Sequence, residues 1–180
     1  MIKKTLLIVL LTNICLPSVQ GWESKLREDG KLIISNLSLN EERVFSSRVR
    51  GKLSIILDNQ KLLLAINWGD FANLSDANVF YNIKEYGIFE EDWKLSNDGK
   101  VAYSPNPVLM LLEILVSDTL IIGIRPKYNN EIRYTFNISN LSEHLLKNRS
   151  RFSFIADLEF YGKDDQLVPE SINIKQNLNK

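Results

Sequence analysis

Few side chains of this sequence belong to the types that carry out acid–base or nucleophilic chemistry. His144 is the only histidine and Cys15 the only cysteine. General-base catalysis needs a partner that orients the histidine ring, so a lone histidine in a helical segment usually lies at the surface or near a helix end. The sequence contains no G-x-S-x-G motif, no phosphate-binding loop and no histidine pair for zinc. We therefore expect no catalytic residue, no metal site and no cofactor.

Carboxylates offer the one remaining route to catalysis, because paired carboxylates meet in space rather than in sequence. Asp70, Asp98 and Asp118 are the best candidates for a carboxylate-based hydrolase, which stays open as an alternative. Two acidic clusters lie at 90–92 and 164–165. Charged residues are usually exposed, so we interpret both clusters as solvated turns.

Aromatic residues are concentrated between Trp68 and Trp93, a stretch that also contains Tyr81. If these rings are exposed, they mark a binding surface. If they are buried, they belong to the core of a β-rich domain, which is the more common place for aromatic residues. We favour the core, and we retain Trp68, Tyr81 and Trp93 as tentative binding residues.

The first 21 residues have the pattern of a secretory signal peptide. Lys3 and Lys4 precede an apolar run over 5–11, which is shorter than the roughly 20 residues that span a bilayer. Val19 and Gly21 occupy the −3 and −1 positions of a cut before residue 22. We predict cleavage after Gly21 and a periplasmic or secreted protein that is not stably inserted in a membrane after the signal is removed.

Removal of the signal changes the charge of the chain. The complete sequence has 180 residues, of which 22 are basic and 22 acidic. The mature chain, 22–180, has 159 residues, and it loses two lysines, so 20 basic residues face 22 acidic ones and the net charge is −2. Binding to nucleic acid requires a basic surplus, so no nucleic-acid partner is expected. The mature chain has no cysteine, and an exported domain without disulfides depends on its hydrophobic core.

Strand signals dominate the mature chain, which we interpret as a single domain over 22–180. Apolar runs at 52–57 and 61–67 flank the turn-prone residues 58–60 and predict a hairpin. Residues 131–138 alternate, with the apolar side chains on one face. Further strands are expected at 32–34, 79–83, 100–103, 119–125 and 151–160.

Two short helices are predicted, at 107–116 and 140–147. Asn106 is a suitable N-cap for the first helix, and Asn140 lies three residues before Glu143, as in a capping box. About eight strands and two short helices favour a mainly β fold. We expect an antiparallel β-sandwich, either immunoglobulin-like or barrel-like.

The stretch from Lys61 to Lys147 resembles a family of exported proteins. Its motifs are, in order, Tyr81-Asn82-Ile83-Lys84, Trp93-Lys94-Leu95-Ser96-Asn97-Asp98-Gly99, an apolar helix, Leu120 to Arg125, and Tyr134-Thr135-Phe136-Asn137-Ile138. This order is similar to that of VasI/TagO accessory proteins, which are associated with bacterial type VI secretion. Asn82 and Lys84 replace the family's Arg and Asp, and its paired cysteines have no equivalents in the mature chain. The resemblance implies no catalytic residue, and it points to Trp93, Ser96, Asp98 and Arg125 as a shared surface.

Three functions follow from these observations, and the first is preferred. It is a non-enzymatic accessory or interaction protein with a protein partner in the bacterial envelope. The alternatives are a periplasmic immunity or inhibitor protein that binds a toxin or hydrolase, and the carboxylate-based hydrolase named above. The tentative binding residues are Trp68, Tyr81, Trp93, Ser96, Asp98 and Arg125.

Overall fold

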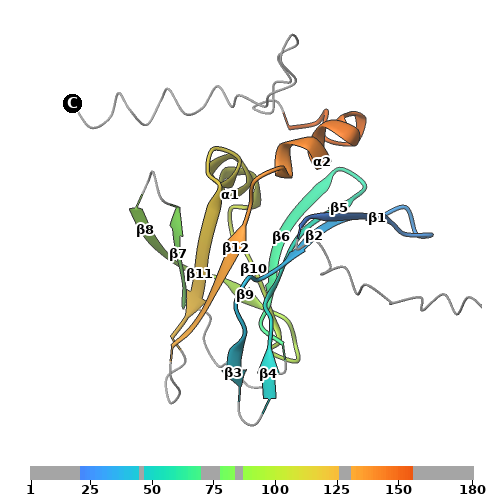
Figure 1. Cartoon of the computed structure of the whole chain (residues 1–180). Helices are drawn as coiled ribbons and strands as arrows, with labels where there is room; N and C mark the ends of the chain where they lie inside the picture. The colour runs from blue at the N-terminus through green and yellow to red at the C-terminus, as the bar shows by residue number, and fades with distance from the viewer. Residues whose placement is uncertain (1–20, 45–46, 70–77, 84–86, 126–130, 156–180) are drawn as a thin grey trace, which may run out of the picture.

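Two antiparallel sheets form the body of the molecule (Figure 1). This computed structural model describes residues 21–44, 47–69, 78–83, 87–125 and 131–155. One sheet has six strands in the order β1-β2-β5-β6-β10-β9, the other has four in the order β12-β11-β7-β8, and β3 pairs with β4. Two α-helices lie at one end of the sheets and the β3–β4 pair at the other (Figure 1). The prediction of a mainly β, antiparallel fold with two short helices is therefore confirmed.

The bounds of the elements are as follows. The strands are β1 (Glu23–Leu26), β2 (Leu32–Leu37), β3 (Glu42–Val44), β4 (Ser47–Val49), β5 (Lys52–Asp58), β6 (Lys61–Asn67), β7 (Asn78–Ile83), β8 (Gly87–Asp92), β9 (Lys94–Leu95), β10 (Val101–Tyr103), β11 (Thr119–Ile124) and β12 (Ile132–Asn137). The helices are α1 (Pro107–Ile114), α2 (Leu141–Lys147) and the 3-10 turn η1 (Arg149–Arg151).

A single hydrophobic cluster joins the two sheets and both α-helices. Strand β12 shows how alternation builds it, because Ile132, Tyr134 and Phe136 are buried while Arg133 between them is exposed. The other inward-facing residues include Leu32, Ile34, Leu53, Ile55, Leu57, Leu62, Leu64, Ile66, Trp68, Val79, Tyr81, Ile83, Leu120, Ile122, Ile124, Met110, Leu111, Ile114, Leu141 and Leu145. The domain thus has the continuous core that a chain without disulfides needs.

The hairpin of β5 and β6 is tighter than predicted. Asp58 pairs with Lys61, which leaves a two-residue turn, Asn59-Gln60, in place of the expected three. Asn59 has a φ of 56°, in the left-handed region that asparagine tolerates better than most residues. The short loop is therefore compatible with the local sequence.

Both predicted α-helices are present, but the expected caps are not. Asn106 and Asn140 precede α1 and α2, and neither side chain makes a capping hydrogen bond. Asn140 has a φ of 64°, so its backbone turns sharply between β12 and α2 and its side chain does not close a box with Glu143.

Within the described residues, neither α-helix has the length of apolar sequence that a membrane span requires.

The strand predicted over 151–160 is wrong for its described part. Residues 149–151 form η1, and the chain continues as turns up to 155. Phe152 and Ile155 are both buried and lie three residues apart, and the amide of Ile155 donates to the carbonyl of Phe152 at 3.0 Å. That spacing places both side chains on one side of a helical turn, whereas residues three apart in a strand point to opposite faces. Residues 156–160 lie outside the described part.

Sequence patterns also missed five strands: β1, β3, β4, β8 and β9. Strand β8 contains Glu90, Glu91 and Asp92, so the interpretation of 90–92 as a solvated turn is wrong. All five strands are short or polar, so they lack the apolar alternation that reveals a half-buried strand. The second acidic cluster, 164–165, lies outside the described residues, as does the predicted signal peptide up to residue 20.

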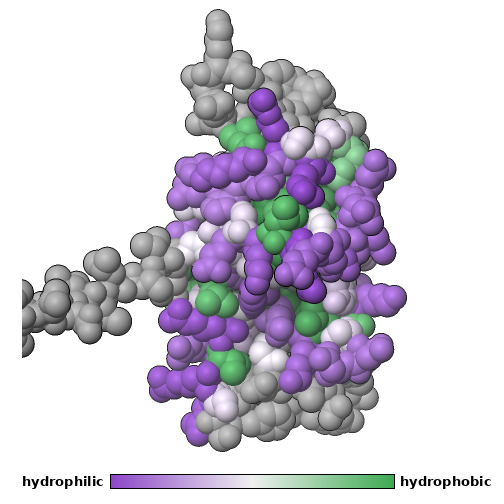
Figure 2. Space-filling model, turned by 90° about the vertical axis from the view of Figure 1, so that its right-hand side faces the viewer, coloured by the Kyte–Doolittle hydropathy of each residue, from purple (hydrophilic) through white to green (hydrophobic). Residues whose placement is uncertain are grey.

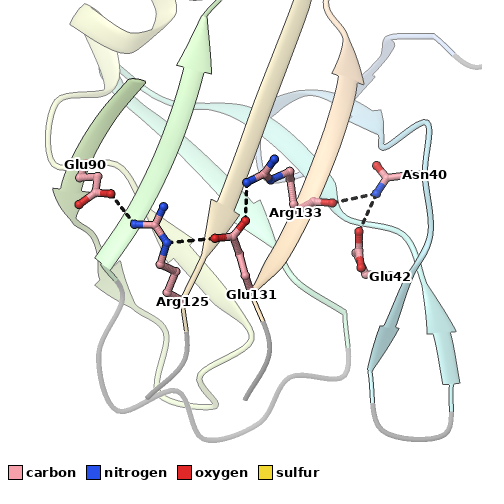
Figure 3. A network of polar contacts seen from close by, with 6 residues as sticks. All are labelled: Asn40, Glu42, Glu90, Arg125, Glu131 and Arg133. Carbon is pink, nitrogen blue, oxygen red and sulfur yellow. Dashed lines mark hydrogen bonds and ion pairs between the residues drawn. The ribbon is translucent and has the colours of Figure 1, made fainter. Parts of the chain in front are cut away.

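The β12 edge of the four-stranded sheet is sealed by the segment that follows β2. The amide of Leu39 donates to the carbonyl of Thr135 at 2.7 Å. The side chain of Asn40 accepts from the amide of Thr135 at 2.8 Å. It also donates to the carbonyl of Arg133 at 2.8 Å (Figure 3). These hydrogen bonds pair the backbone groups of β12 that a further strand would otherwise pair. Because Leu39 and Asn40 follow β2 of the six-stranded sheet, the bonds also connect the two sheets.

Candidate functional site

A row of paired residues crosses the outer face of the four-stranded sheet. Phe80 pairs with Glu90 on β8 and with Gly123 on β11, and Gly123 pairs with Arg133 on β12. Directly paired residues point to the same face, and here it is the face turned away from the core. A Cβ atom at Gly123 would overlap the Phe80 ring. The glycine therefore makes room for the aromatic ring to lie across β11.

Two arginines cover this ring, and Figure 3 shows the carboxylates that hold them. The guanidinium carbons of Arg125 and Arg133 lie 4.6 and 5.5 Å from the centre of the Phe80 ring. Arg125 donates from Nη1 to Glu90 and from Nε to Glu131, the latter at 3.0 Å, and Arg133 donates to the other oxygen of Glu131. As a result Phe80 is only 3% exposed although it lies on an outer face. We call these five residues the Phe80 cluster.

The cluster keeps charges of both signs in fixed positions. Hydrogen bonds from Arg125 and Arg133 lower the pKa of Glu131, and the bonds to Glu90 and Glu131 raise the pKa of Arg125. All four charged side chains remain at least one-third exposed, and Arg125 is 50% exposed. Such an arrangement suits recognition of a complementary surface, because preset charges favour one partner and one orientation.

The aromatic residues proposed for binding lie in the core instead. Trp68, Tyr81 and Trp93 are 0%, 2% and 4% exposed. Trp68 stacks on Tyr134 with 6.1 Å between ring centres, and the Tyr134 hydroxyl donates to the carbonyl of Trp68. Burial, with a smaller effect of Glu42, raises the pKa of Tyr134 to about 12. The binding-surface interpretation of these three residues is therefore wrong, and the core interpretation holds.

Ser96 and Asp98 build the turn between β9 and β10. The Ser96 hydroxyl donates to Asp98 Oδ1 at 2.6 Å, and the amide of Lys100 donates to the same oxygen at 3.1 Å. These bonds lower the pKa of Asp98, the bond from Ser96 most. The turn belongs to the six-stranded sheet, whereas Arg125 follows β11 of the other sheet. Of the six predicted binding residues, only Arg125 belongs to the Phe80 cluster.

The three aspartates proposed for hydrolysis are not brought together in the described residues. Asp98 lies in the β9–β10 turn, Asp118 is exposed just before β11, and Asp70 lies outside the described part. The buried carboxylate is instead Glu113 on α1, to which the Tyr81 hydroxyl donates at 3.5 Å. Burial and the nearby Glu113 and Glu91 raise the pKa of Tyr81. A glutamate in the otherwise apolar sequence of α1 was the signal that could have revealed this contact.

His144 joins α2 to the edge strand β1. Its Nδ1 atom lies 2.8 Å from the hydroxyl oxygen of Ser24. Burial, together with the nearby Lys147, lowers the pKa of His144. No group of three histidine, cysteine or acidic residues that could hold a metal ion occurs in the described part of the chain.

Protonation of His144 should make the domain less stable. Because its pKa in the folded state lies below the ordinary value of about 6.5, stability is fully present above that value and is lost as the pH falls through the folded-state pKa. We expect urea denaturation between about pH 5 and 8 to show this loss, and His144→Gln to remove it. Ser24→Ala, which keeps the imidazole, should retain the pH dependence. An unchanged pH profile in His144→Gln would contradict this assignment.

A hollow of about 740 Å³ lies on the other sheet, beside the β1–β2 hairpin. Its charged lining is mixed, since Lys25, Arg27 and Lys52 are accompanied by Glu23, Glu28 and Asp29. Figure 2 shows the side of the molecule that carries this hairpin as mostly hydrophilic, with isolated hydrophobic residues. The mixed charges indicate no single class of ligand, so we place the candidate site at the Phe80 cluster.

Comparison with known proteins identifies no family for this chain. No protein-family model matches it, and no curated protein matches it either. Among solved structures it is similar to the crystal structure of invasion associated protein B from Bartonella henselae, with a TM-score of 0.49 and 12% sequence identity. The match covers 72% of this chain and 92% of that one. No family model thus supports the resemblance to VasI/TagO proteins, which stays a prediction.

Proposed function

We propose that the mature chain is a non-enzymatic protein of the bacterial envelope that binds another protein through the outer face of its four-stranded sheet. The observation that carries this proposal is the Phe80 cluster. Arginine is enriched in the hot spots of protein interfaces, and the Phe80 ring, itself only 3% exposed, supports both arginines from beneath. The four linked charges around this ring are 33–55% exposed, so they are available to a partner, and preset charges favour one partner and one orientation.

Export and an accessory role rest on the sequence. The signal-peptide pattern of residues 1–21 supports a periplasmic or secreted protein. The resemblance to VasI/TagO proteins supports a role beside a type VI secretion machine, and Arg125 is both the family-like arginine of that motif and the centre of the Phe80 cluster. We therefore propose an envelope component of such a machine as the partner.

Neutralising the two arginines should weaken binding strongly without unfolding the protein. We expect Arg125→Gln with Arg133→Gln to reduce capture of the partner from native periplasm by at least roughly tenfold, as for an interface hot spot. The thermal unfolding midpoint should barely change, because the ion pairs are exposed. Quantitative mass spectrometry of the captured proteins is the measurement. The matched control, Lys25→Gln with Lys52→Gln, removes two charges from the outer face of the other sheet.

Two results decide between the hypotheses: which protein is captured, and whether its capture requires Arg125 and Arg133. A secretion component that is retained by the control and lost with the arginine variant supports the proposal. Capture of a toxin or hydrolase in an amount equimolar with the chain would favour the immunity or inhibitor alternative. Undiminished capture by the arginine variant would contradict the assignment of the Phe80 cluster as the binding surface.

A further inference from the structure

We propose that β8 is a docking edge, to which an extended basic segment of the partner adds as a fifth strand of the four-stranded sheet. This inference rests on the proposed function and names how the partner binds. A strand at the edge of a sheet presents unpaired amides and carbonyls, which are a template for a strand of another protein. In the described part of the chain, β8 pairs only with β7.

The two edges of the four-stranded sheet are treated differently. Leu39 and Asn40 seal β12 through hydrogen bonds to its backbone. Strand β8 has six residues and carries Ile88, which is 67% exposed, the largest exposed fraction among the large hydrophobic residues described. Within the described residues this edge is unsealed, and its carboxylates, which hinder indiscriminate pairing, restrict strand addition to a segment of opposite charge.

The edges of the six-stranded sheet are less suited to this role. Strand β9 has only two residues. Strand β1 carries Lys25, a residue type that protects edge strands from further pairing, and its Ser24 contacts His144 of α2. Strand β8 is therefore the best template for an added strand in the described part of the molecule.

The charge of β8 selects a basic occupant. Its second half carries three consecutive carboxylates, Glu90, Glu91 and Asp92. Glu91 pairs with the buried Val79 and acts on the Tyr81 hydroxyl, so it lies on the core-facing side of β8, where its Oε2 atom is buried. A donor side chain opposite Glu91 on an added strand would share this face and could bond to the carboxylate. A second copy of β8 would instead bring three more carboxylates to the same edge, which like-charge repulsion disfavours.

The register of an antiparallel added strand defines the sequence that fits. Residues directly opposite one another share a face, so basic residues should lie opposite Glu90 and Asp92, and a hydrogen-bond donor opposite Glu91. Valine or isoleucine should lie opposite Phe89 and Ile88. From its N-terminus the segment therefore resembles Lys-Thr-Lys-Val-Val, a short basic stretch followed by β-branched residues.

The test uses the peptide acetyl-Lys-Thr-Lys-Val-Val-amide with the isotope-labelled mature chain. At saturating peptide we expect amide hydrogen exchange within 87–92 to slow by at least roughly tenfold, as for a newly paired edge. Two N-methylated peptides, one for each set of alternate amides, are the controls. Only one set faces β8 in an added strand, so one N-methylated peptide should lose binding and the other should keep it.

Charge reversal provides a second arm. Glu91→Lys with Asp92→Lys should weaken peptide binding at least roughly tenfold, whereas Glu23→Lys on β1 should leave it unchanged. Slowed exchange on β1, equal binding of both N-methylated peptides, or no slowing within 87–92 would overturn the inference. Capture of the partner through Arg125 and Arg133 is measured separately, so failure of the edge inference is distinguishable from failure of the proposed function.

Discussion

Replacing Trp68 with alanine should lower the free energy of unfolding by roughly 3–5 kcal/mol, the cost usual for removing a buried tryptophan side chain. Trp68 is completely buried and stacks on Tyr134. The surrounding strands can close the resulting cavity only in part, so the lost contacts and the cavity both contribute. Urea denaturation of the mature chain is the measurement.

Trp68→Phe is the matched control, since it retains an aromatic ring and should cost clearly less than the alanine variant. Near-normal stability of Trp68→Ala together with loss of partner capture would place the indole at a binding surface. That outcome would restore the interpretation that the sequence left open and would contradict the buried position of Trp68.

Replacing Gly123 with valine should cost about 3 kcal/mol of the free energy of unfolding, at the upper end of the usual cost of overpacking. A Cβ atom at this position would overlap the Phe80 ring and lie 2.5 Å from the carbonyl oxygen of Ile132. Strand β11 pairs on both sides, with β7 and β12, so it cannot shift to relieve the overlap. Intrinsic strand propensity predicts the opposite sign, because valine favours strands more than glycine does.

A double-mutant cycle with Phe80→Ala tests the physical reason for this cost. Removing the ring should recover part of the loss caused by Gly123→Val, giving a coupling energy between the two sites. The overlap with the Ile132 carbonyl remains in the double variant, so recovery should be incomplete. Equal costs of Gly123→Val with and without the Phe80 ring would show that the glycine does not accommodate the ring.

Local pattern was sufficient for the parts of the fold that carry a strong apolar signal. The two strands of the hairpin over 52–67 and the alternating strand within 131–138 are present, although the hairpin turn is one residue shorter than predicted, because one face of each strand is buried. Strand β8 was missed because its sequence, Gly-Ile-Phe-Glu-Glu-Asp, belongs to an edge and carries acidic residues at its end. Apolar alternation reveals a strand only when one of its faces is buried. An edge strand such as β8 exposes most of its side chains and therefore lacks this alternation.

The candidate site depended on contacts that no local pattern contains. Arg125 was named from the sequence, but its partner Glu90 lies 35 residues away, and only the pairing of β7 with both β8 and β11 brings them together. The same limit applies to Trp68, since composition alone does not distinguish a core aromatic from a surface one. Ser96 and Asp98 share a sequence motif with Trp93, yet they form the β9–β10 turn of the six-stranded sheet and lie outside the Phe80 cluster.

Site-specific photo-crosslinking in the native envelope tests the central claim most directly. A benzophenone amino acid is placed at Asn78, which is exposed on the outer face of the four-stranded sheet, or at Lys52, which is exposed on the outer face of the six-stranded sheet. We predict a discrete protein adduct from position 78 and none from position 52, identified by mass spectrometry. An adduct from position 52 alone, or adducts of equal yield from both positions, would contradict the claim that the partner binds the sheet that carries the Phe80 cluster.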